Sequence, residues 1–321
     1  MIKIGVLVDE SPAKDYLNQI FGNNPFQISC LYHSAQDQNM FSEFFTEVPQ
    51  TKSFETLLKN SDALLFLEGA SPNPDNIVKA LKNFKHIFLS LPPKISEKEF
   101  SDIVKLADEA NVLVWTGNPL LFSPAFFSCK QEILNPVHIE IKRKGIPQFR
   151  LNKDITGKLI SDIEFILAII NGHPRKVHAT GVHVEGNQFN MINSHIEFDN
   201  GTSAGITYNM LHKENFHKAR IYQHEKYISI DFPEGKSNVY KLQEPLNIEN
   251  SLEEANISYN SSKRFIANHD SFQNEIMAFH NSLVGLSIPG VMFEESFLAR
   301  TMAEEILGKI LIPVNHNISR S

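Results

Sequence analysis

Histidine is the residue type in this sequence that offers the most chemistry, because imidazole binds metal ions and titrates near neutral pH. Six of the thirteen histidines fall in one strand-rich stretch of the chain, at His178, His183, His195, His212, His217 and His224. They could converge on a metal or form a pH-sensitive interface. His195 and Glu197 would share one face of a strand, but the sequence has no His-x-x-x-His helix or similar ligand pair. We therefore expect histidines scattered over a sheet and no metal site.

The cysteines and the basic residues predict no further site. Cys30 and Cys129 lie in apolar segments, with no second cysteine or histidine at metal-ligand spacing, so we expect both in the core. The formal net charge is -7, and the longest basic run is the short segment Lys142–Lys144. Binding to a polyanion needs a concentrated basic surface. Nucleic acid is therefore not an expected partner.

Length and composition are those of a globular protein with two domains. The chain has 321 residues, of which 42% are hydrophobic. No apolar stretch approaches the ~20 residues that a membrane-spanning helix needs. The first residues run directly into a strand-like segment, without the basic region and cleavage site of a signal peptide. We expect a cytoplasmic protein that does not bind membranes.

Strands and helices alternate over residues 1–120. Ser11 before Pro12, and Ser96 three residues before Glu99, are helix start signals. The expected strands are 2–8, 26–32, 63–67, 86–91 and 112–116, and the expected helices are 12–21, 53–60, 75–84 and 97–110. Because parallel neighbours need crossover helices, this alternation predicts an α/β fold with a Rossmann-like doubly wound parallel sheet.

The pattern changes in residues 121–321, where we expect an α+β domain with a large, open and mostly antiparallel sheet. The expected helices are 125–134, 159–170, 272–283 and 294–310, and the expected strands begin at 137–142 and continue from 177 to about 240. Residues 198–202 form a hairpin turn, and residues 241–268 are expected to be a long loop. The last helices, about 271–310, are expected to pack back towards the first domain.

Several local strings resemble one protein family in the right order along the chain. These strings are Asp62–Phe66, Ala80–Pro92, Phe122–Phe126, Ile196–Thr202, Arg220–Tyr222, Glu275–Phe279 and Phe293–Glu295. They resemble the glucose–fructose oxidoreductase / inositol dehydrogenase (Gfo/Idh/MocA) family. The resemblance implies an NAD- or NADP-dependent oxidoreductase that oxidises a sugar, polyol or related small molecule bound in the cleft between two domains. It also implies a homodimer or homotetramer formed through the open sheet.

The cofactor positions that the resemblance implies are Val8, Asp9, Glu10, Ser11, Glu68, Gly69 and Pro92. A dinucleotide fingerprint needs glycine after the first strand, so that the backbone can approach the diphosphate. Asp9 and Glu10 occupy this turn instead, and their charges would repel the diphosphate. Alternatively, they serve only as acidic residues that stabilise a helix N-terminus. The second strand ends at His33 without the acid that binds the ribose hydroxyls. The missing acid is compatible with NADP, whose ribose carries a phosphate that His33 could contact. Alternatively, His33 is a surface histidine with no role in binding.

The catalytic positions that the resemblance implies are also altered. Leu91 stands at the family's lysine position, and leucine can neither bind a hydroxyl by a hydrogen bond nor assist its proton transfer. Lys94, two residues after Pro92, could swing back, or it is a solvent-exposed lysine. Asp162 stands at the position of the acid/base histidine. It could be a base if burial raised its pKa, or it serves as a polar or capping group.

Three functions are compatible with these substitutions. The chain is an oxidoreductase of this type with an unusual cofactor pocket, or a pseudoenzyme that keeps the scaffold as a binding or regulatory protein. In the third, the cleft binds another small molecule and catalyses chemistry without nicotinamide. Fold alone does not decide between them.

Overall fold

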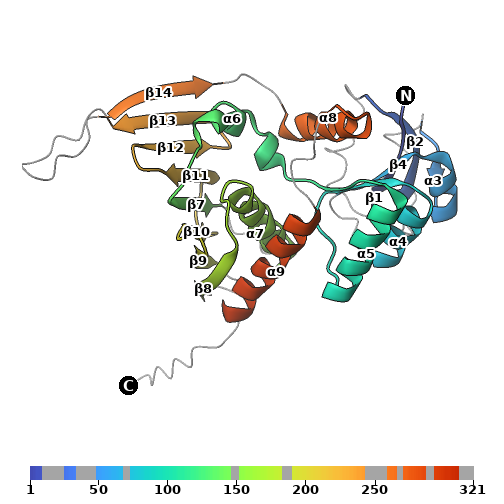
Figure 1. The fold of residues 1–321 in the computed structure, drawn as a ribbon, viewed down its shortest axis with the longest axis horizontal. Helices are drawn as coiled ribbons and strands as arrows, with labels where there is room; N and C mark the ends of the chain where they lie inside the picture. Colours follow the sequence, from blue (N-terminus) through green and yellow to red (C-terminus); the bar gives the residue numbers. More distant parts are fainter. Residues whose placement is uncertain are drawn as a thin grey trace, which may run out of the picture. The chain divides into compact units, whose positions relative to one another are not determined.

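The computed structural model describes residues 1–8, 25–33, 48–67, 73–145, 152–182, 190–242, 259–265, 270–286 and 293–310 (Figure 1). The expected helix 12–21 lies outside these residues. The chain divides into two compact units. Unit 1 contains Met1–Phe122 and His269–Arg300, and unit 2 contains Ser123–Asn268 and Thr301–Ser321.

Unit 1 is built on a six-stranded parallel sheet, which confirms the doubly wound fold that the alternation predicted. The strands are β1 (Lys3–Val8), β2 (Gln27–His33), β3 (Gln50–Thr51), β4 (Ala63–Phe66), β5 (His86–Leu89) and β6 (Val114–Thr116). Their order is β3-β2-β1-β4-β5-β6, and every neighbouring pair is parallel. This is the strand order of dinucleotide-binding sheets, in which the order reverses between the first and fourth strands.

Three helices cover one face of this sheet, and each begins at a side-chain cap. They are α3 (Phe54–Asn60), α4 (Pro74–Lys82) and α5 (Glu97–Ala110), capped by Ser53, Asn73 and Ser96. The predicted capping box is confirmed, because Ser96 and Glu99 each bind the other's backbone N–H. Figure 1 shows α4 and α5 side by side.

Helix α8 (Ser271–Leu283) packs on the opposite face of the six-stranded sheet through aromatic side chains. Ile87 and Leu89 belong to the core under α4 and α5, so Phe88 between them points the other way. Its ring lies 6.4 Å from Phe272 and 5.5 Å from Phe279, measured between centroids.

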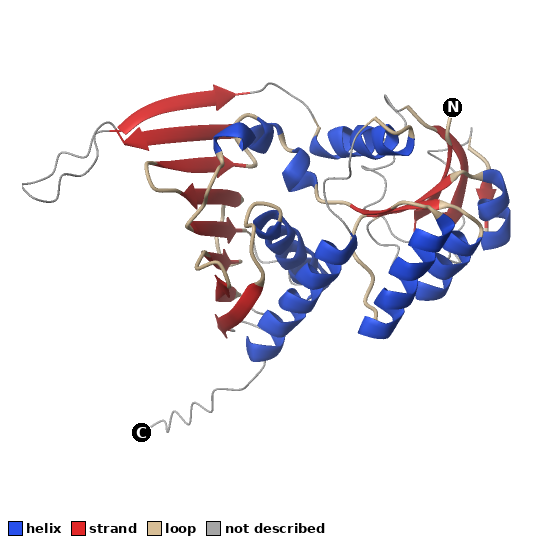
Figure 2. Cartoon of the chain, viewed as in Figure 1, coloured by secondary structure: helices blue, strands red, loops and turns tan. Residues whose placement is uncertain are grey.

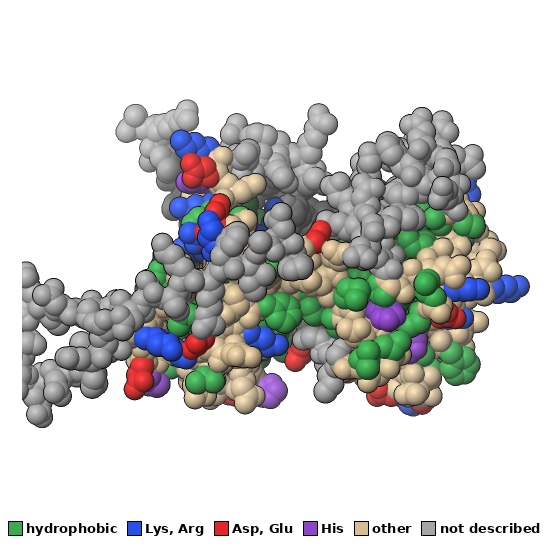
Figure 3. All heavy atoms as spheres, turned by 90° about the horizontal axis from the view of Figure 1, so that it is seen from above, with side chains coloured by type: hydrophobic (Ala, Val, Ile, Leu, Met, Phe, Trp, Pro, Cys, Tyr) green, Lys and Arg blue, Asp and Glu red, His purple; other side chains and the backbone are tan. Residues whose placement is uncertain are grey.

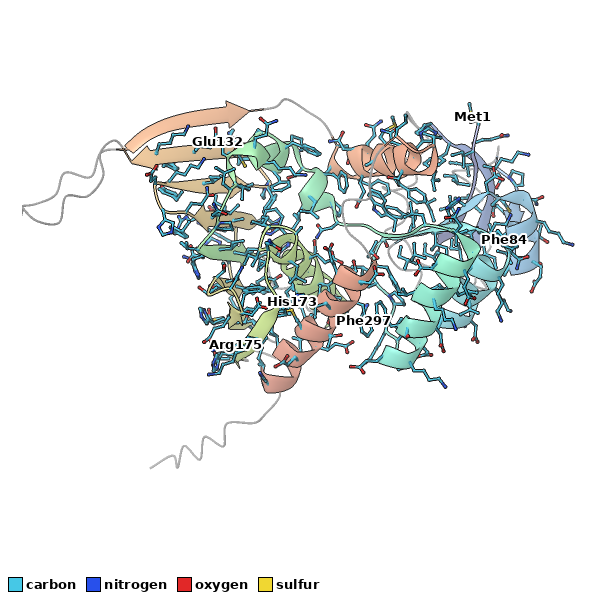
Figure 4. The ribbon with its side chains drawn as sticks, viewed as in Figure 1. Met1, Phe84, Glu132, His173, Arg175 and Phe297 are labelled. Atoms are coloured by element: carbon cyan, nitrogen blue, oxygen red, sulfur yellow. The ribbon has the colours of Figure 1, made fainter. Side chains whose placement is uncertain are left out.

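Helix α9 (Phe293–Ile310) is divided between the units after Arg300. In unit 1, the Phe297 ring stacks on Phe100 of α5 at 4.1 Å between centroids (Figure 4).

Unit 2 is built on an eight-stranded sheet. The strands are β7 (His138–Lys144), β8 (Pro174–Val182), β9 (Met191–Phe198), β10 (Ser203–Asn209), β11 (Phe216–Tyr222), β12 (Lys226–Asp231), β13 (Lys236–Leu242) and β14 (Tyr259–Phe265). Their order is β14-β13-β12-β11-β7-β10-β9-β8, and only the pair β7 and β10 is parallel. The predicted mostly antiparallel sheet is confirmed. Figure 2 shows α7 (Asn152–Leu167) against one face of it.

Two local expectations need correction. Residues 259–265 are not loop but strand β14, which is held by the ladder to β13 rather than by a hydrophobic pattern of its own. The expected helix 125–134 is only the short α6 (Pro124–Phe127) followed by a 3-10 turn, Lys130–Glu132. It stops because Gln223 of the sheet accepts hydrogen bonds from the backbone N–H groups of Leu134 and Asn135.

Candidate functional site

The carboxyl ends of β1 and β4 are where a doubly wound sheet binds its ligand, because the strand order reverses there. Val8 ends β1 and is buried. The other cofactor positions named from the sequence, Asp9, Glu10, Ser11, Glu68 and Gly69, lie outside the described residues. Val8 therefore provides backbone at this edge but no charged contact.

The segment after β5 is held by α9. The carbonyl oxygen of Pro92 accepts hydrogen bonds from both Nε, at 2.9 Å, and Nη2 of Arg300. Pro92 is buried, Leu91 is half-buried and Lys94 is exposed. At the position where the resemblance implies a lysine, the chain therefore has an apolar side chain, and Lys94 is exposed.

Asp162 is the centre of a buried polar cluster in unit 2, together with Arg143, Tyr208 and His217. Its Oδ1 accepts hydrogen bonds from Nη2 of Arg143 and Nε2 of His217, both at 2.8 Å. Its Oδ2 accepts from Nε of Arg143 at 3.2 Å and from the hydroxyl of Tyr208 at 2.5 Å. An ionised carboxylate has about four acceptor positions. All of them are used within this cluster.

Strand register assembles the three partners of Asp162. Arg143 on β7 pairs directly with Tyr208 on β10 and with His217 on β11. Residues that pair across neighbouring strands point to the same face of a sheet. The three side chains therefore form one row across β10, β7 and β11, and Asp162 of α7 lies over that row.

The charges of this cluster fix its protonation. Burial alone would raise the pKa of Asp162, but its electrostatic interactions with Arg143 and His217, and the hydrogen bonds from both, hold it well below its ordinary value. Burial raises the pKa of Tyr208 well above its usual range, and the neighbouring Asp162 charge raises it further. Burial works to lower the pKa of Arg143, but the Asp162 carboxylate outweighs it and raises the pKa. Asp162 is therefore a permanent counter-ion at neutral pH and does not take up a proton there.

His217 binds Asp162 through only one of its two ring nitrogens. Its side chain is 9% exposed, and its ring packs on Phe232 at 4.5 Å between centroids. Nε2 is used by Asp162. In the part of the chain that the structure describes, Nδ1 has no hydrogen-bond partner.

The positions of Arg143, Tyr208 and His217 along their strands indicate that these side chains face the core, although their residue types do not. Each of them continues an alternating apolar row that faces the core. Arg143 follows the buried Ile139 and Ile141, Tyr208 follows Ala204 and Ile206, and His217 precedes Ala219 and Ile221. A polar residue in phase with buried neighbours must find a partner inside. This phase distinguishes His217 from the exposed His178 and His195.

A second buried carboxylate anchors α8 in unit 1. Glu275 is 1% exposed, and its Oε1 accepts a hydrogen bond from the backbone N–H of Asn118 at 2.5 Å. A Cβ added at the neighbouring Gly117 would lie 2.8 Å from the Phe88 ring and 3.3 Å from Glu275. Glycine is therefore required where β6 ends against α8.

Other classes of site receive little support from the described residues. No group of three His, Cys, Asp or Glu side chains among them could hold a metal ion, and none of their helices is long and apolar enough to cross a membrane. On the face drawn in Figure 3, basic and acidic side chains are intermixed.

A parallel six-stranded sheet followed by an eight-stranded, mostly antiparallel sheet defines the class of fold. It is the fold of Gfo/Idh/MocA-type dehydrogenases, as the resemblance predicted. No protein-family model matches the sequence.

Among solved structures, the chain is similar to UDP-N-acetylglucosamine 3-dehydrogenase GnnA from Acidithiobacillus ferrooxidans. The TM-score is 0.84 at 18% identity, covering 96% of this chain and 97% of that one. The dehydrogenase MviM from Clostridium difficile matches with a TM-score of 0.78 at 14% identity, covering 96% and 99%. A probable dehydrogenase from Thermotoga maritima matches with a TM-score of 0.76 at 15% identity, covering 96% of each chain.

A curated relative is similar in sequence as well. UDP-N-acetylglucosamine 3-dehydrogenase of Acidithiobacillus ferrooxidans is 23% identical over 191 residues, which are 59% of this chain. The match spans 61% of the length of that relative.

Proposed function

We propose that this protein is an oxidoreductase that uses NAD or NADP to oxidise a CH–OH group of a sugar, polyol or related small molecule. The observation that carries the proposal is the pairing of a dinucleotide-type strand order in unit 1 with the eight-stranded sheet of unit 2. The same fold, over 97% of its chain, is found in a UDP-N-acetylglucosamine 3-dehydrogenase. A nucleotide sugar is accordingly the first substrate to test.

In a doubly wound sheet, a dinucleotide binds beside the carboxyl ends of the strands where the strand order reverses. Here these are the ends of β1 and β4, where Val8 and Leu67 are both buried. Once bound, a nicotinamide supplies the acceptor for the hydrogen and electron pair that leave the substrate carbon. The residue that handles the hydroxyl proton must be another group than Leu91, which has no polar atom.

A second candidate function is a catalytically silent binding or regulatory protein of the same fold. Two observations favour it. Leu91 replaces the lysine that the family resemblance implies, and Asp162 is saturated by Arg143, Tyr208 and His217. In this function the cluster serves only to hold α7 on the sheet.

Thermal unfolding in the presence of NAD, NADH, NADP or NADPH separates the two candidates. A ligand that binds only the native state stabilises it by about 2.7 kcal/mol at a hundred times its Kd. We expect one nicotinamide pair to raise the Tm, and UDP-N-acetylglucosamine with the oxidised cofactor to produce the reduced form. A Tm unmoved by all four cofactors at millimolar concentration would reject the oxidoreductase and leave the binding protein.

A further inference from the structure

Two Asn-Gly dipeptides contact each other in unit 2. Asn171–Gly172 lies between α7 and β8, and Asn200–Gly201 forms the tip of the hairpin between β9 and β10. Nδ2 of Asn200 donates a hydrogen bond of 2.8 Å to the backbone carbonyl oxygen of Asn171. A Cβ added at Gly172 would lie 2.7 Å from the same Nδ2. The contact between the two turns therefore requires glycine at this position.

Asparagine before glycine can lose its side-chain amide without an enzyme. The backbone nitrogen of the glycine, which no Cβ shields, attacks Cγ of the asparagine. A C–N bond forms, the bond from Cγ to Nδ2 breaks, and the amide leaves as ammonia with the proton of the glycine N–H. Water from the solvent then opens the cyclic imide at either carbonyl. The products are aspartate and isoaspartate.

The reacting groups of Asn200–Gly201 are held by the fold. Nδ2 of Asn200 is bound to Asn171, and its Oδ1 accepts a hydrogen bond from the N–H of Thr202 at 3.0 Å. The N–H of Gly201 donates to the carbonyl oxygen of Phe198 at 3.2 Å. Reaction here requires these three hydrogen bonds to open first. We therefore expect it to be slow in the folded protein.

The reacting groups of Asn171–Gly172 are not held in this way. In the part of the chain that the structure describes, neither the side-chain amide of Asn171 nor the N–H of Gly172 has a hydrogen-bond partner. Asn171 is exposed, so water reaches the imide. The hydrogen bond from Asn200 to the carbonyl oxygen of Asn171 also polarises this peptide group. Polarisation makes the N–H of Gly172 more acidic, which favours its attack on Cγ.

We infer that Asn171 is a site of spontaneous deamidation in the folded protein, whereas Asn200 is protected by its hydrogen bonds. This modification site does not depend on the proposed function. Isoaspartate carries the main chain through Cβ and Cγ, so its formation displaces the carbonyl group that binds Asn200. It also adds a carboxylate to a turn that already contacts Asp199, whose Oδ1 accepts a hydrogen bond from the N–H of His173 at 2.9 Å. Modification at Asn171 therefore weakens the contact between the two turns.

Peptide mapping by mass spectrometry tests the inference. The full chain would be incubated at mildly alkaline pH in water enriched in heavy oxygen and then digested in ordinary water, so that only modification during incubation carries the label. We expect labelled aspartate and isoaspartate at Asn171 to form about tenfold or more faster than at Asn200, where hydrogen bonds must open first. In the chain unfolded by urea, the two rates should be similar.

The variant Asn171→Gln is the matched control, because glutamine must close a larger ring to react and still leaves the backbone carbonyl for Asn200. The Tm of the incubated wild type should fall as Asn171 is modified, and that of incubated Asn171→Gln should not. The inference is overturned if the folded chain modifies Asn171 and Asn200 at equal rates, or if Asn171 stays intact while the unfolded chain reacts. An unchanged Tm in wild type modified at Asn171 would overturn the weakened contact.

Discussion

Asp162 illustrates how one side chain can have opposite properties depending on its partners. A carboxylate buried alone would be a weak acid and a possible base. Four donated hydrogen bonds and the Arg143 charge make this one a fixed anion instead. Asp162 therefore acts as a counter-ion within the cluster and not as a base.

Replacing Asp162 with asparagine should destabilise the protein strongly. The change leaves the guanidinium of Arg143, which is 17% exposed, without its counter-ion. Removing one member of a buried ion pair typically costs about 3–5 kcal/mol. Urea unfolding measures the difference. The control is Glu109→Gln, which breaks an exposed pair with Lys105 and should cost less than about 1 kcal/mol. A loss below about 1 kcal/mol for Asp162→Asn would mean that the pair contributes little.

The same carboxylate sets a direction for acid unfolding. Its folded pKa is lowered relative to the unfolded chain, where aspartate titrates near about 3.9. The unfolded state therefore binds the proton first as the pH falls. Its stabilising contribution is complete above about pH 4 and is lost as the pH falls further. The free energy of unfolding should therefore fall below about pH 4 in the wild type, and this part of the fall should be missing in Asp162→Asn.

His86 predicts a pH effect nearer neutrality. Burial lowers its pKa, which the charge of Asp62 opposes, and its Nδ1 accepts a hydrogen bond from the N–H of Leu113 at 3.0 Å. Because the folded pKa lies below the unfolded value of about 6.5, stability is complete above that pH and decreases as the pH falls below it. His86→Asn keeps an acceptor near Nδ1 but does not titrate. Its Tm should fall less than that of the wild type between about pH 7.5 and about pH 5.5. An equal fall in Tm for the wild type and His86→Asn over this pH range would contradict this role of His86.

At the scale of elements, sequence patterns located most helices and strands but not their pairings. The capping box at Ser96 and the turn before Gly201 were predictable, because both depend on residues close in sequence. The cluster at Asp162 was not, because it depends on the register of β7 with β10 and β11. Strand β14 was missed for the same reason. Its partner β13 is separated from it by residues 243–258.

Gly5 gives an element-scale prediction, because it lets α3 pack closely on β1. A Cβ at this position would lie 2.5 Å from Ser61 Oγ and 2.6 Å from Leu57 Cδ1. Gly5→Ala should therefore destabilise unit 1 by about 1–3 kcal/mol, as overpacking of a core does. Gly308→Ala is the control, since nothing lies within 4 Å of a Cβ there and alanine stabilises an exposed helix position by about 0.8–1 kcal/mol. A neutral Gly5→Ala in thermal unfolding would mean that α3 can shift at no cost.

For the whole molecule, the alternation of strands and helices over residues 1–120 was enough to predict the doubly wound sheet, and the succession of strands from 177 to about 240 predicted the mostly antiparallel one. The alternation leaves few arrangements once parallel strands require crossover helices. Function was harder to predict, because the substitutions at Leu91 and Asp162 could be judged only with their surroundings known. Self-association through the open sheet stays a prediction. Figure 2 shows no helix of the described residues over its outer face, where Tyr227 and Tyr240 stack at 4.3 Å between centroids.

Transfer of deuterium from substrate to cofactor tests the proposed oxidoreductase most directly. The protein would be incubated with NAD or NADP and with UDP-N-acetylglucosamine deuterated at carbon 3, or with deuterated glucose or inositol, and the cofactor analysed by mass spectrometry. We predict reduced nicotinamide that carries the deuterium. Cofactor that stays oxidised with every substrate would contradict an oxidoreductase of this class and favour the silent binding protein.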